Sequence, residues 1–490
     1  MSGGMTTLTK SRFTTGCQCE KLLWWTVHEP EAKELEPDKV LLDLFDQGRQ
    51  VGELAREVFP GGVLIGRGPR AERLAATQAA LESDAPAIFE ASFEAGGVFV
   101  AVDVLLREES GWTLIEVKAS NAAKEEHIPD AAIQLWVLRQ AGLDVPRIEV
   151  MHLNREYRHP GHGPLLARSD ITVDAESFLP QVTGLVVQFQ AALAGPNPGT
   201  RVGLHCHEPR DCPFLDRCWP QDPEHIRTLY NVGPKRTAAY MAAGVHRIAD
   251  LPAGGRLPPT ALRQIKALQE HQLVVEPTLA IQLEAFESPL GYLDFETVAR
   301  AVPVWDGLAP WGAAVAQFSY HEEQHDGSHT HVGWLAEGPD DPRRELAEAM
   351  LAATANARRI VTYSSYEQTR IRELQALVPE LAAPLDELLD KLVDLLPVVR
   401  NNVYHPEFRG SFSLKQVLTP LVHDLSYSDL VIVDGRLASV EIARLLFVAH
   451  RIPEAERDRL RQDLLDYCER DTWATVRLMG RLRELAAALA

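Results

Sequence analysis

Apolar positions recur every three or four residues in the first part of the chain, up to about residue 85. The segments VLLDLFDQGRQVGELAREVF and AERLAATQAALES have this spacing, which predicts helices with one apolar face. From Ile88 to Lys118 the pattern changes to short β-rich runs, IFEASFEA, GGVFVAVDVLL and WTLIEVKAS, separated by Gly-Gly and Glu-Ser-Gly. These runs predict a meander of three strands, followed by a helix around DAAIQLWVLRQAG and a strand near RIEVMHLN.

Segments rich in glycine and proline divide the rest of the chain. The Pro- and Gly-rich segment GPNPG at 195–199 precedes three cysteines, and residues 223–285 have a helical pattern broken by Gly and Pro. A β-rich unit opens at LGYLDFET, after which strand and helix patterns alternate to the end. We therefore predict an α/β protein with an N-terminal domain at 1–222, a helical linker at 223–285 and a C-terminal domain at 286–490.

Length and charge narrow the function classes. The chain has 490 residues, which predicts two or three domains, and it has 49 Lys and Arg against 69 Asp and Glu. This acidic balance excludes a surface that is basic throughout, but not a nucleic-acid enzyme with carboxylates around metal ions and one basic groove. Because there is no run of 18 apolar residues and no apolar secretory segment at the start, we expect a cytoplasmic protein that does not cross a membrane.

The first candidate site lies in the predicted meander. Glu116 and Lys118 are two apart on a strand, so they project from one face, and a hairpin turn at REESG places Asp103 roughly opposite residues 115 and 116. Adjacent carboxylates repel unless a divalent cation neutralises them, and the Val117 carbonyl offers a further oxygen ligand. Such a site suits Mg²⁺, with Lys118 orienting the attacking water. The alternative is a surface hairpin that carries a salt bridge.

This motif resembles the PD-(D/E)XK nuclease superfamily, in particular its RecB-like branch. Asp103, Glu116 and Lys118 match the core motif, and Gln134 matches the glutamine of the following helix. The aromatic residue usual four positions later is Leu138 here. The upstream metal-binding histidine of RecB-like members has Glu53 in its place, either as a metal ligand or as ordinary solvent-facing surface.

The cysteines form a second signal. Cys206, Cys212 and Cys218 are each separated by five residues, without the short spacing that zinc knuckles favour. A [4Fe–4S] cluster needs four thiolates, and the fourth would come from the N-terminal segment SRFTTGCQCEKLLWW. The alternative is chance burial of free thiols.

The order of one early cysteine and three after the nuclease motif resembles the iron–sulfur RecB-like nucleases. These include the CRISPR-adaptation exonucleases and the AddB-type helicase–nucleases. In those families a basic and aromatic segment follows the early cysteine, which fits Cys19 better than Cys17. The spacing within the later triplet departs from the family pattern. The resemblance implies a structural [4Fe–4S] cluster on Cys19, Cys206, Cys212 and Cys218.

A second acidic constellation lies in the C-terminal part. Asp294 and Glu296 share one face of an apolar strand, where buried acids are costly unless they bind metal. Tyr467 and Asp471 are four apart on a predicted helix and so share a face, and Glu367 lies near a predicted helix start in RIVTYSSYEQTRIREL. The alternative for DFET alone is a strand edge with charged ends.

Together these motifs resemble the DnaQ-like, DEDD-type 3′→5′ exonucleases of the ribonuclease-H-like fold. The resemblance implies that Asp294, Glu296, Glu367 and Asp471 hold two divalent ions, Mg²⁺ or Mn²⁺, and that Tyr467 orients the attacking water. The middle motif departs from the family, because Ser364 and Glu367 stand where Asn and Asp are usual. Asp394 corresponds to a strand aspartate that does not bind metal.

Over nearly its full length the chain resembles a bacterial family of unknown function that joins these two modules. The segments that carry this resemblance are LTKSRF, LGYLDFET, TYSSYEQTRIREL, SFSLKQVL and YCERDTWA. The linker at 223–285 resembles a helix–hairpin–helix DNA-backbone reader, with a plain helical spacer as the alternative.

Basic and aromatic residues interleave in the segment RNNVYHPEFRGSFSLKQVL. They suit contacts with a single nucleic-acid strand, with a solvated loop packed by its own aromatic rings as the alternative. The basic residues are Arg400, Arg409 and Lys415, and the aromatic residues are Tyr404, Phe408 and Phe412.

We therefore expect a metal-dependent nuclease that hydrolyses DNA, single-stranded or with a free end, in bacterial repair or defence. The alternative is a nucleic-acid-binding or scaffold protein in which one or both sites are inactive. Glu367 keeps this alternative open for the C-terminal site.

Overall fold

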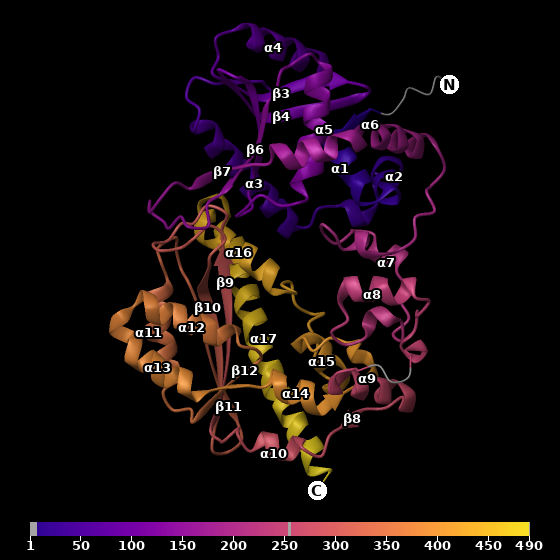
Figure 1. Ribbon diagram of the computed structural model, residues 1–490. Coiled ribbons are helices and arrows are strands. Elements are labelled where there is room, and N and C mark those ends of the chain that lie inside the picture. The colour runs from indigo at the N-terminus through magenta and orange to yellow at the C-terminus, as the bar shows by residue number, and fades with distance from the viewer. Residues whose placement is uncertain (1–6, 253–255, 490) are drawn as a thin grey trace. The chain divides into compact units, whose positions relative to one another are not determined.

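The computed structural model describes residues 7–252 and 256–489 and has a mixed α/β architecture (Figure 1). It divides into two compact units. The first runs to Trp219 and includes residues 300–304 and 308–311, and the second contains the remaining residues. The predicted linker at 223–285 falls in the second unit, and its residues 253–255 lie outside the described part of the chain. Within the described ranges, no helix combines the length and apolar character needed to cross a membrane.

The first unit is built on one mixed sheet with strand order β2-β3-β4-β5-β6-β7 and a short β1 paired to β4. The predicted meander is present as β3, β4 and β5, joined through Gly96–Gly97 and through Glu109–Ser110. Both glycines have positive φ, of 58° and 76°, which explains why this tight turn uses Gly-Gly. The strands are β1 (Leu8–Thr9), β2 (Val63–Leu64), β3 (Ala87–Ala95), β4 (Val98–Glu108), β5 (Gly111–Lys118), β6 (Arg147–Leu153) and β7 (Leu166–Asp170).

Helices cover both faces of this sheet. The larger apolar core includes residues of α1, α2, α5 and α6 packed on β3, β4, β5 and β6, and a smaller cluster joins α3 to the sheet. The helices are α1 (Lys10–Gln18), α2 (Glu20–His28), α3 (Lys39–Glu57), α4 (Arg70–Glu82), α5 (His127–Gln140), α6 (Thr172–Ala194) and α7 (Leu215–Cys218). Two short 3₁₀ helices are η1 (Lys33–Leu35) and η2 (Leu204–Cys206).

The β5-α5-β6 segment positions the polar residues of the first unit. Strands β5 and β6 are parallel, so α5 crosses over the sheet between them. Most of α5 is buried, including the polar side chains of Asp130 and Gln134. Because burying an unpaired polar group is costly, such residues need partners on the neighbouring strands.

Residues 220–252 and 256–289 form a small helical region with its own apolar cluster of Ile226, Leu229, Val232, Ile248, Ala261 and Leu268. Gly233 starts α8 with a φ of 62°, a conformation that favours glycine. The elements are η3 (Ile226–Thr228), α8 (Gly233–Ala242), η4 (Ile248–Asp250), α9 (Pro259–Glu270), β8 (Val274–Val275) and α10 (Leu279–Leu283).

The main sheet of the second unit has strand order β11-β10-β9-β12-β13. Strands β9, β10 and β11 are antiparallel neighbours, whereas β12 is parallel to both β9 and β13. The strands are β9 (Leu290–Ala299), β10 (Ala313–Glu323), β11 (His329–Leu335), β12 (Arg359–Thr362) and β13 (Leu392–Asp394). A further strand, β14 (Val403–Tyr404), pairs with β8.

Helices lie on both faces of this sheet, and the long helix α17 crosses one of them (Figure 1). Leu293 and Phe295 of β9 pack among apolar residues of α11, α12 and α13. Tyr292 belongs to the core that includes α17, so alternation along β9 turns Asp294 and Glu296 toward α17. The helices are α11 (Arg343–Ala353), α12 (Tyr366–Leu377), η5 (Pro379–Leu381), α13 (Ala382–Lys391), α14 (Leu396–Asn402), η6 (Pro406–Phe408), α15 (Leu414–Leu421), α16 (Gly435–Phe447), η7 (Ala449–Arg451) and α17 (Glu454–Ala487).

Candidate metal centres and a cysteine cavity

The N-terminal centre forms where β4 and β5 pair. Val104 lies opposite Ile115, so the next positions, Asp103 and Glu116, are neighbours on one face, as the hairpin predicted. The Asp103 Oδ2 atom accepts a hydrogen bond of 2.8 Å from the Val117 backbone N–H. Glu116 is 1% exposed, so its carboxylate needs strong partners.

Glu116 receives three side-chain donors. The Lys10 ammonium donates to both carboxylate oxygens, at 2.8 and 3.0 Å, and Lys118 donates to Oε1 at 2.7 Å. Gln134 Nε2 donates to Oε2 at 2.7 Å. Lys118 also donates to Asp130 Oδ2 at 2.6 Å, which adds a third carboxylate to the group.

The charges of this group depend on one another. Burial and then the neighbouring Glu116 raise the pKa of Asp103 to about 7, and the same two causes raise the pKa of Asp130. Burial alone would raise the pKa of Glu116, but Lys10 and Lys118 outweigh it and hold that pKa well below its usual range. A cation beside Asp103 and Asp130 would favour their ionised forms as well.

Gln134 supplies a test of whether a cation fits here. Its Oε1 atom is buried and has no hydrogen-bond partner among the described residues, whereas its Nε2 atom is fully used. An unpartnered buried oxygen next to three carboxylates fits an oxygen-liganded Mg²⁺ or Mn²⁺ site. A cavity of about 350 Å³, lined by Lys118 and Asp130 among others, opens on this group.

Sequence reasoning missed two members of this centre. Asp130 lies one helical turn before Gln134, a spacing that could have identified it. Lys10 could not be found in this way, because it comes from a distant helix. Glu53 is exposed on α3 and belongs to no group of three or more metal-ligating side chains among the described residues, so its role as a ligand stays a prediction.

Four cysteines line a separate cavity in the first unit. Cys19, Cys206, Cys212 and Cys218 lie around it together with apolar residues that include Trp25 and Phe214. Cys19 is at the junction of α1 and α2, and the other three come from the segment after α6. The predicted early and late cysteines therefore meet in space.

The cysteine cavity distinguishes Cys19 from Cys17. Cys17 is exposed and lines the cavity beside Lys118, not the cysteine cavity. Burial, with contributions from the other three cysteines of the cavity, raises the pKa of Cys212 to about 11. The cavity that the four cysteines line is small, about 10 Å³, and among the described residues no three of their sulfur atoms lie within 4.8 Å of one another.

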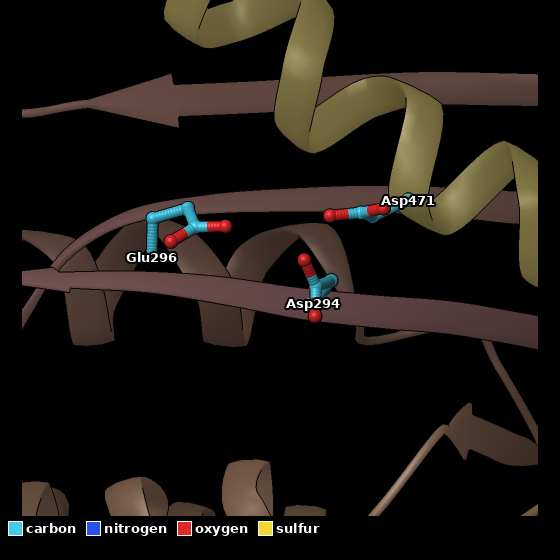
Figure 2. Close-up of side chains that lie close together, drawn as sticks. All are labelled: Asp294, Glu296 and Asp471. Atoms are coloured by element: carbon cyan, nitrogen blue, oxygen red, sulfur yellow. The ribbon is translucent and has the colours of Figure 1, made fainter. Parts of the chain in front are cut away.

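The C-terminal centre joins β9 to α17. Asp294 and Glu296 project from β9 and Asp471 from α17, and their carboxylates point toward one another (Figure 2). One carboxylate oxygen of each residue lies within 4.8 Å of the others, a spacing that can hold a metal ion. In the described part of the chain, Asp103, Glu116 and Asp130 do not reach this mutual spacing.

Burial is the main cause of the raised pKa values of the C-terminal carboxylates, and repulsion adds to it for Asp294 and Glu296. Burial and then Asp471 raise the pKa of both Asp294 and Glu296 well above their usual ranges. Burial also raises the pKa of Asp471, although a hydrogen bond from the Tyr427 hydroxyl opposes this rise. Three acids with raised pKa values in one place, one buried and two partly exposed, are a costly arrangement that a divalent cation would relieve.

Glu367 lies beside this trio rather than inside it. It is at the start of α12, as predicted, is 4% exposed, and lines a cavity of about 310 Å³ together with Ser364, Asp294 and Asp471. Its Oε2 atom is buried without a hydrogen-bond partner among the described residues, and burial raises its pKa to about 7. Asp394 ends strand β13 and contributes to that rise.

Two tyrosines and a lysine border the trio. Tyr467 is buried one helical turn before Asp471, as the spacing predicted. The Lys415 ammonium donates to the Tyr467 hydroxyl at 3.1 Å and lies 4.6 and 4.7 Å from the ring centroids of Tyr427 and Tyr467. Lys415 lowers the pKa of Asp471 and Glu296, though less than burial raises them. Sequence reasoning did not identify Tyr427.

The first turn of α16 closes one side of this centre. A Cβ atom on Gly435 would lie 3.4 Å from Glu296 Oε2, so a larger residue would press on this carboxylate. Asp434 caps the helix by accepting hydrogen bonds from the backbone N–H groups of Arg436 and Leu437. The partial positive charge of a helix start favours the ionised form of a nearby acid.

The predicted strand-binding segment has a different role. Tyr404 and Phe408 are fully buried and Phe412 is 8% exposed, and their rings pack against one another in the core. The rings therefore cannot stack on bases. They pack on one another, as the alternative held, but in the core and not in a solvated loop. Of its three basic residues, Lys415 is the one that lines the acidic cavity.

Comparison with known proteins gives one family match. A family model described as "Domain of unknown function (DUF2779)" matches residues 291–413. No curated protein matches the sequence significantly. The matched segment contains Asp294, Glu296 and Glu367 but ends before Tyr467 and Asp471. In this segment, about a quarter of the chain, the protein is similar to the DUF2779 family.

Proposed function

We propose that this protein is a metal-dependent nuclease with two hydrolytic centres, one in each unit. The observation that carries the proposal is the convergence of Asp294, Glu296 and Asp471. One of these acids is buried and two are partly exposed, and all three have raised pKa values. Without a counter-ion this arrangement destabilises the fold, so a catalytic or binding role is the best account of it.

In the C-terminal centre the trio would hold a divalent cation, Mg²⁺ or Mn²⁺. The cation, when bound, supplies Lewis acidity toward a phosphoryl oxygen and toward water. Phosphodiester hydrolysis forms one phosphorus–oxygen bond from water and breaks another, and the leaving sugar oxygen takes up a proton. Tyr467 would orient the water, and Lys415 would offset negative charge at the phosphoryl group.

The role of Glu367 follows from its position. Its free Oε2 atom faces a cavity shared with Asp294 and Asp471, so it can complete a second cation site after a small movement. Asp294, Glu296, Glu367 and Asp471 would then together hold the two cations. This arrangement corresponds to the DEDD-type exonuclease pattern, with a longer acid in the middle motif.

In the N-terminal centre Asp103, Glu116 and the Val117 carbonyl would hold the cation, following the PD-(D/E)XK pattern. Lys118 would orient the water or offset charge in the transition state. Gln134 supports the site by fixing Glu116, and its free Oε1 atom can bind a water of the cation. We assign Asp130 to this centre as a partner of Lys118.

We further propose that Cys19, Cys206, Cys212 and Cys218 hold a [4Fe–4S] cluster. The cluster, when bound, supplies a covalent link between the start of α2 and the segment after α6. Its role is structural, because it closes a long loop of the first unit.

The proposed substrate is DNA, single-stranded or with a free end. Support comes from the size of the C-terminal cavity, about 310 Å³, which suits the end of one strand better than a duplex. The helical region of the second unit would then contact the DNA backbone or act as a spacer. A bacterial role in repair or in defence against foreign DNA fits both modules.

A second candidate function is a nucleic-acid-binding protein with inactive sites. Two observations favour it: Glu367 lies outside the tight carboxylate group, and Lys10 stands among the carboxylates of the N-terminal centre. The two candidates differ in one property, which is the breaking of phosphodiester bonds.

The test uses full-length protein, purified without oxygen, and single strands labelled at the 5′ or the 3′ end. With Mn²⁺, the Asp103→Asn variant should yield only the products of the C-terminal centre, and Asp294→Asn only those of the N-terminal centre. Product ladders that are identical in both variants and in the unchanged protein would contradict the assignment of two centres. Binding of the strand without any cleavage would favour the second candidate.

A further inference from the structure

Lys10 occupies an unusual position for a lysine of a nuclease centre. Its ammonium contacts both oxygens of Glu116, at 2.8 and 3.0 Å, and lies 4.0 Å from Asp103 Oδ1 and 3.8 Å from Asp130 Oδ1. Its side chain is only 20% exposed. It therefore stands at the point where the three carboxylates of the N-terminal centre converge.

The position of Lys10 bears directly on cation binding. A divalent cation needs carboxylate oxygens as ligands. A carboxylate whose two oxygens both accept hydrogen bonds from an ammonium group is a poor metal ligand. Both carboxylate oxygens of Glu116 accept hydrogen bonds from Lys10. They also accept hydrogen bonds from Lys118 and Gln134. A cation can therefore bind Glu116 fully only after Lys10 has left.

Charge balance points in the same direction. With all groups ionised, three carboxylates and two ammonium groups leave one net negative charge. Adding a divalent cation while Lys10 stays reverses this to one net positive charge, which is costly in a buried group. If Lys10 leaves as the cation enters, the group becomes neutral.

A second, independent observation indicates a ligand in this group. The Gln134 side chain is fully buried, and its Oε1 atom has no partner among the described residues, whereas its Nε2 atom donates to Glu116 of this group. Lys10 does not satisfy this oxygen, so the arrangement around Lys10 leaves a buried acceptor unused. An incoming cation with its waters can supply the missing donor.

Lys10 can leave without unfolding its helix. It is the first residue of α1, and Thr9 caps that helix by accepting a hydrogen bond from the Arg12 backbone N–H at 3.3 Å. The helix start is therefore held by Thr9 and not by the Lys10 side chain. Four side-chain torsions allow the ammonium to swing away.

We propose that Lys10 is an internal competitor for the divalent cation of the N-terminal centre. Its ammonium holds the carboxylates together in the cation-free protein and leaves them when Mg²⁺ or Mn²⁺ binds. This inference rests on the proposed function, because it takes the N-terminal centre to be a cation site. Lys10 thereby sets the cation concentration at which the centre becomes loaded.

The test measures Mn²⁺ binding directly, by the loss of the electron paramagnetic resonance signal of free Mn²⁺. Full-length protein carrying Asp294→Asn serves as the background, so that the C-terminal centre contributes little. In this background Lys10→Met should bind Mn²⁺ at least about tenfold more tightly, whereas the charge-keeping Lys10→Arg should stay within about threefold. Adding Asp103→Asn to Lys10→Met should remove the gain in Mn²⁺ affinity. This result would show that the gain arises at the N-terminal centre.

The outcomes separate this inference from the proposed function. If the Asp294→Asn protein binds Mn²⁺ and the added Lys10→Met change leaves this affinity unchanged or weakens it, the competitor role is overturned and the cation site remains. No Mn²⁺ binding in either protein overturns both. If Lys10→Met fails to fold, Lys10→Gln, which keeps a donor to Glu116 but no charge, takes its place with the same expected gain.

Discussion

A carboxylate oxygen of Asp294 lies within 4.8 Å of one from Asp471, although Asp294 is on strand β9 and Asp471 is on helix α17. The packing of α17 across the sheet thus brings two acids together that repel each other in the absence of a cation. Burial raises the pKa values of both residues, and the charge of Asp471 adds to the rise at Asp294.

Removing one of these charges should stabilise the cation-free protein. Asp294→Asn relieves the repulsion, so we expect its melting temperature in a chelator to rise by several degrees, while Mn²⁺-dependent cleavage by this centre is lost. Calorimetry of the thermal unfolding of the second unit measures the change in melting temperature. The exposed Glu337→Gln is the matched control and should change neither quantity. A lower melting temperature of Asp294→Asn would contradict the repulsion.

The stability of the cation-free protein should fall as the pH rises. The pKa of Asp103 and that of Glu367 are both raised to about 7, from ordinary values of 3.8 and 4.5. In this range the folded protein holds protons that the unfolded chain releases. The stabilisation is therefore complete at low pH and is lost as the pH rises through about 7.

Thermal unfolding in a chelator between pH 5 and pH 8 measures this dependence. Asp103→Asn and Glu367→Gln should each flatten the profile, because neither amide titrates. Mn²⁺ should oppose the loss at pH 8, since a bound cation favours the ionised acids. A profile that rises steadily from pH 5 to pH 8 would be inconsistent with these raised pKa values.

Tyr467 and Lys415 should act on the chemical step more than on substrate binding. Tyr467→Phe removes the hydroxyl that contacts Lys415 and lies near Asp471, and we expect kcat of the C-terminal centre to fall about 100-fold. Lys415→Met should also lower kcat, with Lys415→Arg retaining more activity. Measurements in the Asp103→Asn background isolate this centre. A change confined to KM would argue for a binding role instead.

The cysteine pair Cys17 and Cys19 offers a matched comparison. Cys19 lines the cavity with the three later cysteines, whereas Cys17 is exposed and faces a different cavity. Cys19→Ser should abolish the brown colour and the absorbance near 400 nm of anaerobically purified protein, and Cys17→Ser should keep both. Loss of iron from Cys17→Ser alone would reverse the assignment.

Much of the fold could be predicted from local patterns. The strands around Asp103 and Glu116 alternate regularly and end at Gly-Gly and Glu-Ser-Gly turns, so their register followed from hairpin geometry. The position of Glu367 at the start of α12 and the shared face of Tyr467 and Asp471 likewise depend on nearby residues.

Contacts between distant segments could not be predicted in this way. Lys10 reaches Glu116 because α1 packs on the sheet, and Tyr427 reaches Asp471 from a loop with no regular pattern. The burial of Tyr404, Phe408 and Phe412 also depends on tertiary packing. The sequence does not reveal it, because aromatic residues interleaved with basic ones occur both in core segments and on nucleic-acid-binding surfaces.

The most direct test of the central claim is cleavage of an end-labelled single DNA strand during a titration with Mn²⁺. The unchanged protein should cleave it with a saturating dependence on Mn²⁺ and should stop when a chelator is added. The Asp103→Asn/Asp294→Asn double variant, folded to the same melting temperature or higher, should leave the strand intact at every Mn²⁺ concentration. Full cleavage by this double variant would contradict both hydrolytic centres.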